Sequence, residues 1–462
     1  MAHPEDENGG EGWEYEPNYP AKAAAAEEHI QPPLSLPSPS APTGQSTLNG
    51  VFIPCTQSII GIVLYSRFGW VTGQAGIAGA LLILVTCTVV SFLTALSMCA
   101  IATNGKIPAG GSYYMIARSL GPAFGGSVGV LYFLGLVSSA AVYLVGAVET
   151  LLTNTSYGIV STTFDIRLLG WLGVFLLWIL NFVGMKYVTK TSLGITVILG
   201  LTVLSMYVGF FTAGVRSEDL PRGITGLSWS HMKENLGEEY SAGNGFDTVT
   251  AIFFPAVTGI MAGCDRAGFL STPSRSIPRG TLSAIGITTV LYFSFFLLFG
   301  AVADREALKS ELGMSALISW PTMDGITVGI IIATFGAALQ CASSAPQVLS
   351  AMAQDDILPL RYFKYDVNAS LFATSVLIMF FVTIGHFDSI APAVTMFFLL
   401  FYGCVNVACC VLSVLNNPSW RPLWPYYHWT TALTGSILCF TIMVVISWWS
   451  ALLAFIFAAG LY

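Results

Sequence analysis

The sequence predicts an all-α polytopic membrane protein with twelve transmembrane helices in a 5+5 inverted repeat, the first and sixth helices being broken. Three observations lead to this prediction. Of the 462 residues, 54% are hydrophobic and 9% are charged, whereas soluble proteins carry roughly a quarter charged residues. Apolar runs long enough to cross about 30 Å of hydrocarbon recur along the chain. A proline–glycine motif interrupts two of these runs, five spans apart.

Twelve apolar runs account for residues 50–462, which we predict to form a transmembrane domain. They lie at residues 50–70, 75–101, 122–152, 168–186, 191–214, 246–269, 281–304, 325–351, 369–386, 391–416, 427–445 and 447–462. The last two runs are short, but the others are as long as a membrane-spanning helix requires.

Residues 1–49 differ in composition from the rest, and we expect a disordered, acidic cytoplasmic tail. They hold eight of the 25 acidic residues but a single basic one, Lys22. Because the tail has neither a basic start nor an apolar stretch, it is not a signal peptide. Its run "LSLPSPSAPTGQST" includes Ser38 before Pro39, a candidate site for a kinase. The alternative is a solvated linker.

The basic residues indicate the orientation in the membrane. With the N-terminus in the cytoplasm, the inner loops and helix ends hold Lys106, Arg118, Lys186, Lys190, Arg266, Arg275, Arg279, Arg361, Lys364 and Arg421. This excess agrees with the positive-inside rule. The orientation leaves the "NTS" at Asn154 outside, where it is a glycosylation candidate. We expect the plasma membrane as the location.

The sequence carries no signature of an enzyme. The nine cysteines lie in or beside apolar runs, which favours buried thiols over disulfides. The five histidines show no ligand spacing, and neither HExxH nor a P-loop is present. We therefore expect no catalytic residues, no cofactor, no nucleic-acid partner and no metal beyond transported ions.

The two interrupted runs share a pattern. Residues 52–70 read "FIPCTQSIIGIVLYSRFGW" and residues 253–265 read "FFPAVTGIMAGCD". Proline removes a backbone hydrogen bond and glycine weakens a helix, so we expect each run to divide into half-helices. Paired broken helices in two halves of a chain indicate a transporter binding site near the bilayer midplane. The alternative is two ordinary proline kinks.

Such a break suits ions of both signs. Unwound carbonyls coordinate a cation, while the N-terminus of the following half-helix offers free amides to an anion. The middle of each run lacks Asp, Glu, Lys and Arg. Neutral ligands favour a weakly hydrated cation such as potassium over a divalent ion.

Long stretches of the chain resemble the cation–chloride cotransporters of the amino acid–polyamine–organocation superfamily, whose fold is LeuT-like. The matching stretches, spread over residues 50–462, are "GVFIPCTQSIIGIVLYSR", "ALSMCAIATNGKIPAGGSYYMIARSLGPAFGGSVG", "AVYLVGAVE", "FFPAVTGIMAGCDRAG", "SIPRGT" and "NPSWRPLWPYYHW". The resemblance implies potassium and chloride as transported ions, a lipid bilayer as surroundings and a homodimer. It also implies a large C-terminal cytoplasmic domain that this sequence lacks.

The resemblance also implies the site residues. The potassium set is Ser58, the Ile59 carbonyl, Tyr143, the Pro255 carbonyl and Thr258. One chloride would lie by the amides of Gly61, Ile62 and Val63, and a second by Gly259, Ile260 and Met261 with the Tyr402 hydroxyl. Arg67 and Glu149 would form an extracellular gate. The alternatives are packed tyrosines, and two charged residues that reach the headgroups separately.

Sodium dependence divides this family. Where sodium-dependent relatives carry serines in the eighth span, this chain has Gly336 and Ala337, and Ile60 replaces a tryptophan. We therefore predict sodium-independent, electroneutral potassium–chloride symport by alternating access, although Ser58 stands where the family has asparagine. The alternatives are sodium-coupled chloride transport, amino acid permeation, and a non-transporting partner that regulates a related transporter.

Overall fold

The computed structural model describes residues 44–105, 110–155, 161–218, 220–355, 363, 366–415 and 420–462. Most of the predicted N-terminal tail, including Ser38, lies outside these residues. Pro42–Tyr462 forms one compact unit. Eleven helices in the described ranges are long and apolar enough to cross a membrane. The prediction of a multi-pass, all-α membrane protein is confirmed.

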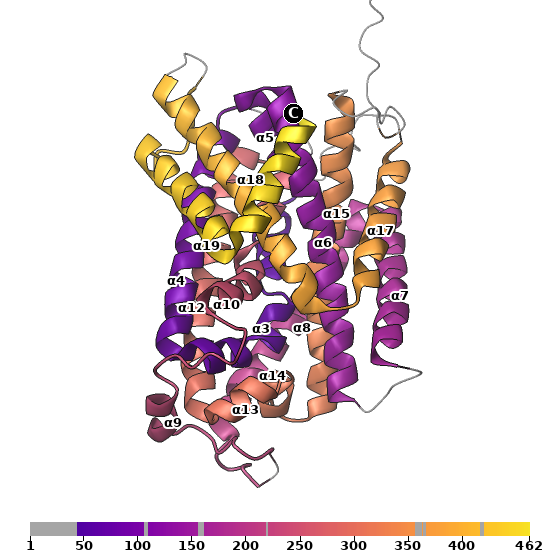
Figure 1. Ribbon diagram of the computed structural model, residues 1–462. Coiled ribbons are helices and arrows are strands. Elements are labelled where there is room, and N and C mark those ends of the chain that lie inside the picture. Colours follow the sequence, from indigo (N-terminus) through magenta and orange to yellow (C-terminus); the bar gives the residue numbers. More distant parts are fainter. Residues whose placement is uncertain are drawn as a thin grey trace, which may run out of the picture. The chain divides into compact units, whose positions relative to one another are not determined.

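Nine of these spans are each a long helix (Figure 1), although the backbone of α4 leaves the helical region at Gly76 and that of α19 at Ser447. They are α4 (Phe68–Ala102), α6 (Pro122–Asn154), α7 (Thr162–Val183), α8 (Met185–Thr212), α12 (Pro273–Val302), α15 (Met323–Gln354), α17 (Val367–Ile384), α18 (Phe387–Leu415) and α19 (Trp429–Leu461). Short helices lie at the two ends of the bundle. Helices α9 (Trp229–Glu234), α13 (Arg305–Ser310) and α14 (Met314–Ile318) are at one end, and α5 (Gly111–Leu120) is at the other.

The difference between twelve predicted spans and eleven long helices lies in α19. The backbone of Ser447 leaves the helical region, with φ −165° and ψ 104°, so α19 consists of two arms. Figure 1 shows the yellow chain turning there and running back toward its end. The two arms correspond to the predicted spans at 427–445 and 447–462.

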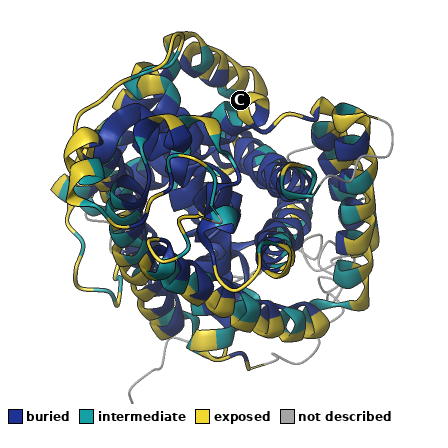
Figure 2. Ribbon diagram, turned by 90° about the horizontal axis from the view of Figure 1, so that it is seen from below, coloured by how far each residue is buried: buried dark blue, intermediate teal, exposed yellow. Residues whose placement is uncertain are grey.

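The two broken spans lie inside a ring of lipid-facing helices. In the most apolar 18-residue stretch of each span, 83% of Leu48–Ser66 and 78% of Phe246–Asp265 are buried, against 22% of α7 and 28% of α17. Figure 2 shows exposed residues on the outer faces of the ring and buried residues within it. The broken spans are therefore shielded from lipid, as non-helical backbone at membrane depth must be.

The first span breaks at glycine and not at its proline. A π-helical turn, η1 (Leu48–Phe52), leads into α2 (Ile53–Ile59), and Pro54 occupies the first turn of α2. Proline is tolerated there because the first amides of a helix lack intrahelical partners. The helix ends at Ile60, and extended Gly61 precedes α3 (Ile62–Ser66). Our assignment of a helix-breaking role to this proline was wrong, whereas the break itself is confirmed.

The sixth span breaks beside its proline. Helix α10 (Phe246–Phe253) tightens into the 3-10 turn η2 (Phe254–Val257), which contains Pro255. Thr258 is extended and Gly259 has a φ of +94°, a region that favours glycine. The chain then forms α11 (Ala262–Asp265) and the turn η3 (Ala267–Phe269). Each half of the chain therefore contains one broken helix, as predicted.

Candidate ion-binding site

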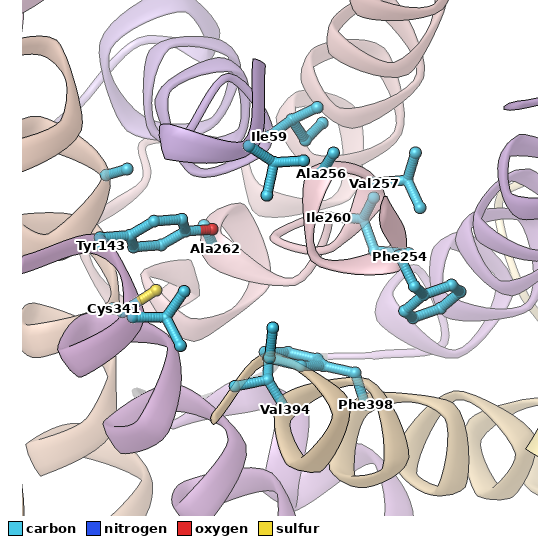
Figure 3. Packing of buried hydrophobic residues seen from close by; sticks show 14 of the residues in the cluster. Ile59, Tyr143, Phe254, Ala256, Val257, Ile260, Ala262, Cys341, Val394 and Phe398 are labelled. Atoms are coloured by element: carbon cyan, nitrogen blue, oxygen red, sulfur yellow. The ribbon is translucent and has the colours of Figure 1, made fainter. Parts of the chain in front are cut away.

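A small cavity lies where the two breaks meet α6 and α15. Its volume is about 10 Å³, near the size of one water molecule or one desolvated ion. The lining residues are Ser58, Tyr132, Leu136, Tyr143, Thr258, Gly259, Ala262, Gln340, Cys341, Ser344 and Phe398. Figure 3 shows Tyr143 pointing its hydroxyl toward the broken segments, with Cys341 and Phe398 nearby. Three residues of the potassium set share this cavity.

Several carbonyl oxygens of the potassium set already accept hydrogen bonds from the protein. The Tyr143 hydroxyl donates to the Ser58 carbonyl over 2.9 Å, and Thr258 Oγ1 donates to the Pro255 carbonyl over 2.8 Å. The Ile59 carbonyl accepts from the Tyr292 hydroxyl over 2.7 Å, on the side of a second small cavity. The carbonyls of Ile59 and Pro255 therefore already have donors, and an incoming cation would compete with them.

Tyr292 of α12 is a site residue that sequence reasoning missed. Its hydroxyl also donates to the Ala256 carbonyl over 3.1 Å, so a single buried side chain binds both breaks. Its ring packs edge-on against Phe68, with centroids 4.9 Å apart. In the sequence, a single tyrosine in an apolar run does not show whether its hydroxyl bonds a distant backbone or its ring simply packs in the core.

The first chloride set lies at the start of α3. The Gly61 amide donates to the Ile59 carbonyl over 2.8 Å. The amides of Ile62 and Val63 belong to the first turn of α3, where helix geometry provides no intrahelical acceptor. The Tyr143 ring lies directly against Gly61, so any larger residue would collide with it. Two of the three predicted amides therefore lack an intrahelical acceptor.

The second chloride set surrounds the other break. A Cβ atom at Gly259 would overlap Ser58, so the two breaks touch at this point. The Ile260 carbonyl accepts from Cys55 Sγ over 3.6 Å, and Met261 precedes α11. The Tyr402 hydroxyl is buried and, within the described ranges, makes no hydrogen bond by geometry. A free donor is available to an anion here.

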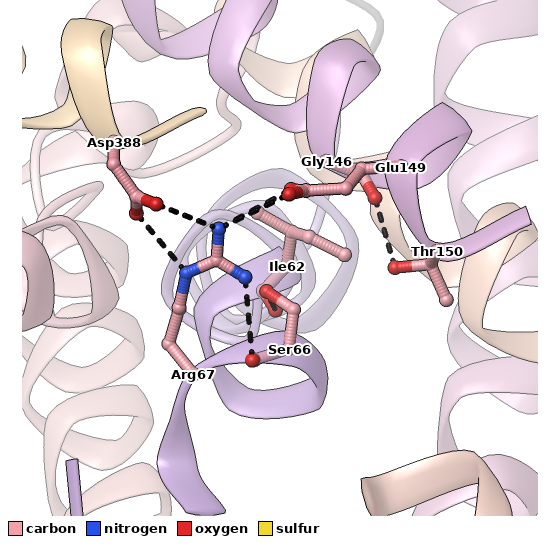
Figure 4. A network of polar contacts seen from close by, with 7 residues as sticks. All are labelled: Ile62, Ser66, Arg67, Gly146, Glu149, Thr150 and Asp388. Carbon is pink, nitrogen blue, oxygen red and sulfur yellow. Dashed lines mark hydrogen bonds and ion pairs between the residues drawn. The ribbon is translucent and has the colours of Figure 1, made fainter. Parts of the chain in front are cut away.

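The predicted gate pair is in contact and has a third member. Arg67 is 2% exposed, and its Nη2 lies 3.3 Å from both carboxylate oxygens of Glu149 (Figure 4). Its Nε lies 3.1 Å from Asp388 of α18, and its guanidinium stacks 4.7 Å above the Phe387 ring. Sequence reasoning missed Asp388, which lies 321 residues further along the chain. One buried cation thus joins α3, α6 and α18.

The eighth span faces the cavity with Gln340, Cys341 and Ser344, and not with the two predicted positions, 336 and 337. A side chain at Gly336 would meet Ile195, and Ala337 is fully buried. One turn later, the buried Gln340 lines the cavity. Its amide donates to Ser192 Oγ over 2.8 Å and to the Gln57 carbonyl oxygen. The sequence did not indicate this link between α2, α8 and α15.

The glycosylation candidate Asn154 is the last residue of α6. Its amide nitrogen donates to Thr327 Oγ1 over 3.1 Å. A glycan would attach at this nitrogen, so attachment requires the bond to open.

Comparison with solved structures agrees with this architecture. MhsT in complex with L-phenylalanine aligns over 90% of this chain and 99% of its own, with a TM-score of 0.52 and 15% identity. Mhp1, a nucleobase–cation symporter with bromovinylhydantoin bound, aligns over 93% and 97%, with a TM-score of 0.54 and 13% identity. At such identities the likeness concerns the fold alone, and it confirms the LeuT-like prediction.

A match to a family model identifies the protein family. Residues 50–462 match the model described as amino acid permease. The chain belongs to the amino acid permease family. The matched residues cover every element described above except the first two residues of η1.

Some curated relatives of this permease chain have a more specific name. "Cation-chloride cotransporter 1" of Oryza sativa subsp. japonica is 39% identical over 90% of the chain, and the Arabidopsis thaliana protein of the same name is 40% identical over 90%. The chain spans about half, 46%, of the length of each. The resemblance to cation–chloride cotransporters is confirmed, and the relatives named are transporters rather than enzymes.

Proposed function

We propose that this permease carries potassium together with chloride by electroneutral, sodium-independent symport. The observation that carries the proposal is the cavity between the two breaks, which is lined by neutral oxygen groups and lies beside the N-termini of two half-helices. The relatives named cation–chloride cotransporters support the same class of substrate.

The cation part rests on the oxygens at the cavity. Ser58, Tyr143 and Thr258 offer hydroxyl and carbonyl oxygens without a full negative charge. Neutral oxygens replace the hydration shell of a large monovalent cation more readily than that of a divalent one. The carbonyls of Ile59 and Pro255 complete the potassium set when Tyr292 and Thr258 yield their hydrogen bonds.

The anion part rests on unbonded donors. The first-turn amides at Ile62 and Val63 and the hydroxyl of Tyr402 are donors beside the same breaks, with Gly61, Gly259, Ile260 and Met261 forming the backbone around them. Helix N-termini favour anions by about 0.3–1 kcal/mol each, and more when water is excluded. A cation and an anion held within one closed cavity region compensate each other's charge.

Sodium independence rests on α15 and the first break. Gly336 and Ala337 contribute no hydroxyl, and Ile60 is buried and apolar. A small, hard cation needs more oxygen ligands than these three positions offer. The cavity has room for one ion or one water molecule but not for an amino acid, which disfavours amino acid permeation.

Uptake of rubidium, a potassium tracer, tests the proposal in cells that express the chain. We expect uptake to require external chloride and to be unchanged when sodium is replaced. Tyr143→Phe removes the hydroxyl that bonds the Ser58 carbonyl, and we expect about tenfold lower uptake at subsaturating rubidium.

The matched control is Tyr207→Phe, which removes a partly buried hydroxyl that bonds Ser294 of α12 away from the cavity. We expect normal uptake from this variant. Uptake that needs sodium would support sodium-coupled chloride transport. Chloride-independent or absent uptake, despite normal expression at the cell surface, would contradict the proposal and favour the amino acid or non-transporting alternatives.

The cellular setting belongs to the same proposal. The excess of basic residues in alternate loops supports a cytoplasmic N-terminus, with Asn154 outside, in the plasma membrane. The resemblance supports a homodimer, and the Ser38–Pro39 sequence supports control by a kinase. Protease protection of the tail in sealed cells distinguishes the two orientations.

A further inference from the structure

The side-chain amide of Gln340 lies where α15 borders the cavity. Gln340 is fully buried and lines the cavity together with three residues of the potassium set, Ser58, Tyr143 and Thr258. Its Oε1 is buried and, among the residues that the structure describes, has no hydrogen-bond partner. Buried polar atoms without partners are rare in native structures and commonly indicate a water or an ion. The cavity that Gln340 lines has room for one of either.

A chain of hydrogen bonds establishes that the free amide atom of Gln340 is its oxygen. The side-chain nitrogen of Gln57, in α2, lies 2.7 Å from the Ser192 backbone carbonyl. A carbonyl can only accept a hydrogen bond, so the Gln57 atom beside it must be the nitrogen, and the other Gln57 amide atom is the oxygen. That oxygen also can only accept, so the Gln340 atom that contacts it is Nε2. The remaining amide atom of Gln340 is therefore the acceptor Oε1.

The same hydrogen bonds hold the amide in one orientation. Gln340 Nε2 also donates to Ser192 Oγ over 2.8 Å, so both of its bonds go to buried residues of α2 and α8. Gln57 and Ser192 are both in the described ranges, and neither lines the cavity. The oxygen and the nitrogen of an amide group lie on opposite sides of the same carbon atom. Oε1 therefore points away from Gln57 and Ser192.

We propose that Gln340 Oε1 is a ligand for the transported cation in the cavity. This inference rests on the proposed function and adds to it a ligand from α15 that the potassium set does not contain. An amide oxygen resembles a backbone carbonyl, and carbonyl oxygens can replace the hydration shell of potassium. The carbonyls of Ile59 and Pro255 already accept hydrogen bonds, whereas Gln340 Oε1 accepts none from the described residues. A cation can therefore bind this oxygen without displacing a donor.

Equilibrium binding of ⁸⁶Rb⁺ to the purified full chain in detergent, with choline chloride as the background salt, tests the proposal. Gln340→Met and Gln340→Glu both remove the nitrogen that bonds Gln57 and Ser192, but only Gln340→Glu retains an oxygen at the end of the side chain. We expect Gln340→Met to raise the Kd for Rb⁺ about tenfold. Gln340→Glu should bind Rb⁺ about tenfold more tightly than Gln340→Met does. The difference between the two variants isolates the oxygen from the hydrogen bonds of the nitrogen.

Gln347→Met is the matched control on the same helix. Gln347 lies two turns further along α15, and its Nε2 donates to the Ser343 carbonyl over 3.0 Å. Its Oε1 is likewise buried without a hydrogen bond in the described part of the chain, but Gln347 does not line the cavity. We expect Gln347→Met to bind Rb⁺ as the wild type does. An equal loss of affinity in Gln347→Met and Gln340→Met would overturn the ligand assignment.

The wild type separates a failure of this inference from a failure of the proposed function. If it binds Rb⁺ and Gln340→Met binds equally well, or if Gln340→Met and Gln340→Glu weaken binding equally, the inference alone is overturned. If it binds ²²Na⁺ and not Rb⁺, the proposed potassium transport is wrong, and the same comparison with ²²Na⁺ decides the role of Gln340. A wild type that binds neither ion overturns both.

Should Gln340→Met fail to fold, Gln340→Asn takes its place in the comparison. It keeps an amide but withdraws the oxygen by one methylene, so we expect a similar rise of about tenfold in the Kd for Rb⁺. A Kd equal to that of the wild type or of Gln340→Glu would overturn the proposal.

Discussion

Arg67→Met is expected to open the α13–α14 end of the transporter and to abolish coupled transport. Arg67 is the only cation of the described gate, and it bonds carboxylates on α6 and α18 at once. Removing one partner of a buried, hydrogen-bonded charge cluster costs about 2–5 kcal/mol. Glu149 and Asp388 are 27% and 59% exposed. Because water can solvate both acids, we expect the lower value, about 2 kcal/mol, or a roughly 30-fold shift toward the open state.

Thiol labelling measures this shift. Leu136 lines the cavity, and a cysteine can be placed there by Leu136→Cys. This cysteine should react with a membrane-impermeant maleimide about 30-fold faster when Arg67→Met is also present than when Arg67 is intact. Arg67→Lys should be intermediate, since an ammonium keeps the charge but cannot bond both carboxylates in the same planar geometry. The exposed Arg222→Met is the control. Equal labelling rates in all variants would show that Arg67 does not hold this end closed.

Gly259→Ala is expected to eliminate transport and to lower the thermal stability of the protein. The alanine would adopt a φ of +94° and would place its Cβ on Ser58, where the two breaks touch. A positive φ alone costs a residue with a Cβ about 1–2 kcal/mol, and the overlap forces the breaks apart. The total should exceed about 3 kcal/mol, which is a large fraction of the stability of a typical protein.

The melting temperature in detergent measures the loss of stability, and rubidium uptake measures the loss of transport. Gly286→Ala is the matched control, since nothing lies within 4 Å of the added Cβ in α12. Adding Ser58→Gly to Gly259→Ala removes the overlapping atom, so it should restore part of the melting temperature but not uptake. If Gly259→Ala melts and transports as the wild type does, the two breaks are not in the contact described here.

Much of the fold followed from the sequence because the membrane imposes a length and a polarity on each span. The apolar runs identified the spans, and even the division at Ser447 falls at the start of the last predicted run. The proline–glycine motif identified both breaks, although it assigned the first to Pro54 rather than to Gly61. The sequence also pointed to Arg67 and Glu149 as a pair, through resemblance and not through spacing.

Only the tertiary structure decided which side chains from distant spans meet. Tyr292 binds both breaks, and Asp388 joins Arg67 and Glu149. The sequence of an apolar helix does not show which of its faces packs against the protein, because most of its surface meets lipid or other apolar side chains. The sequence by itself therefore determined the spans and their breaks. The rotation of each helix about its axis, and with it the hydrogen-bond partners, depended on close packing in three dimensions.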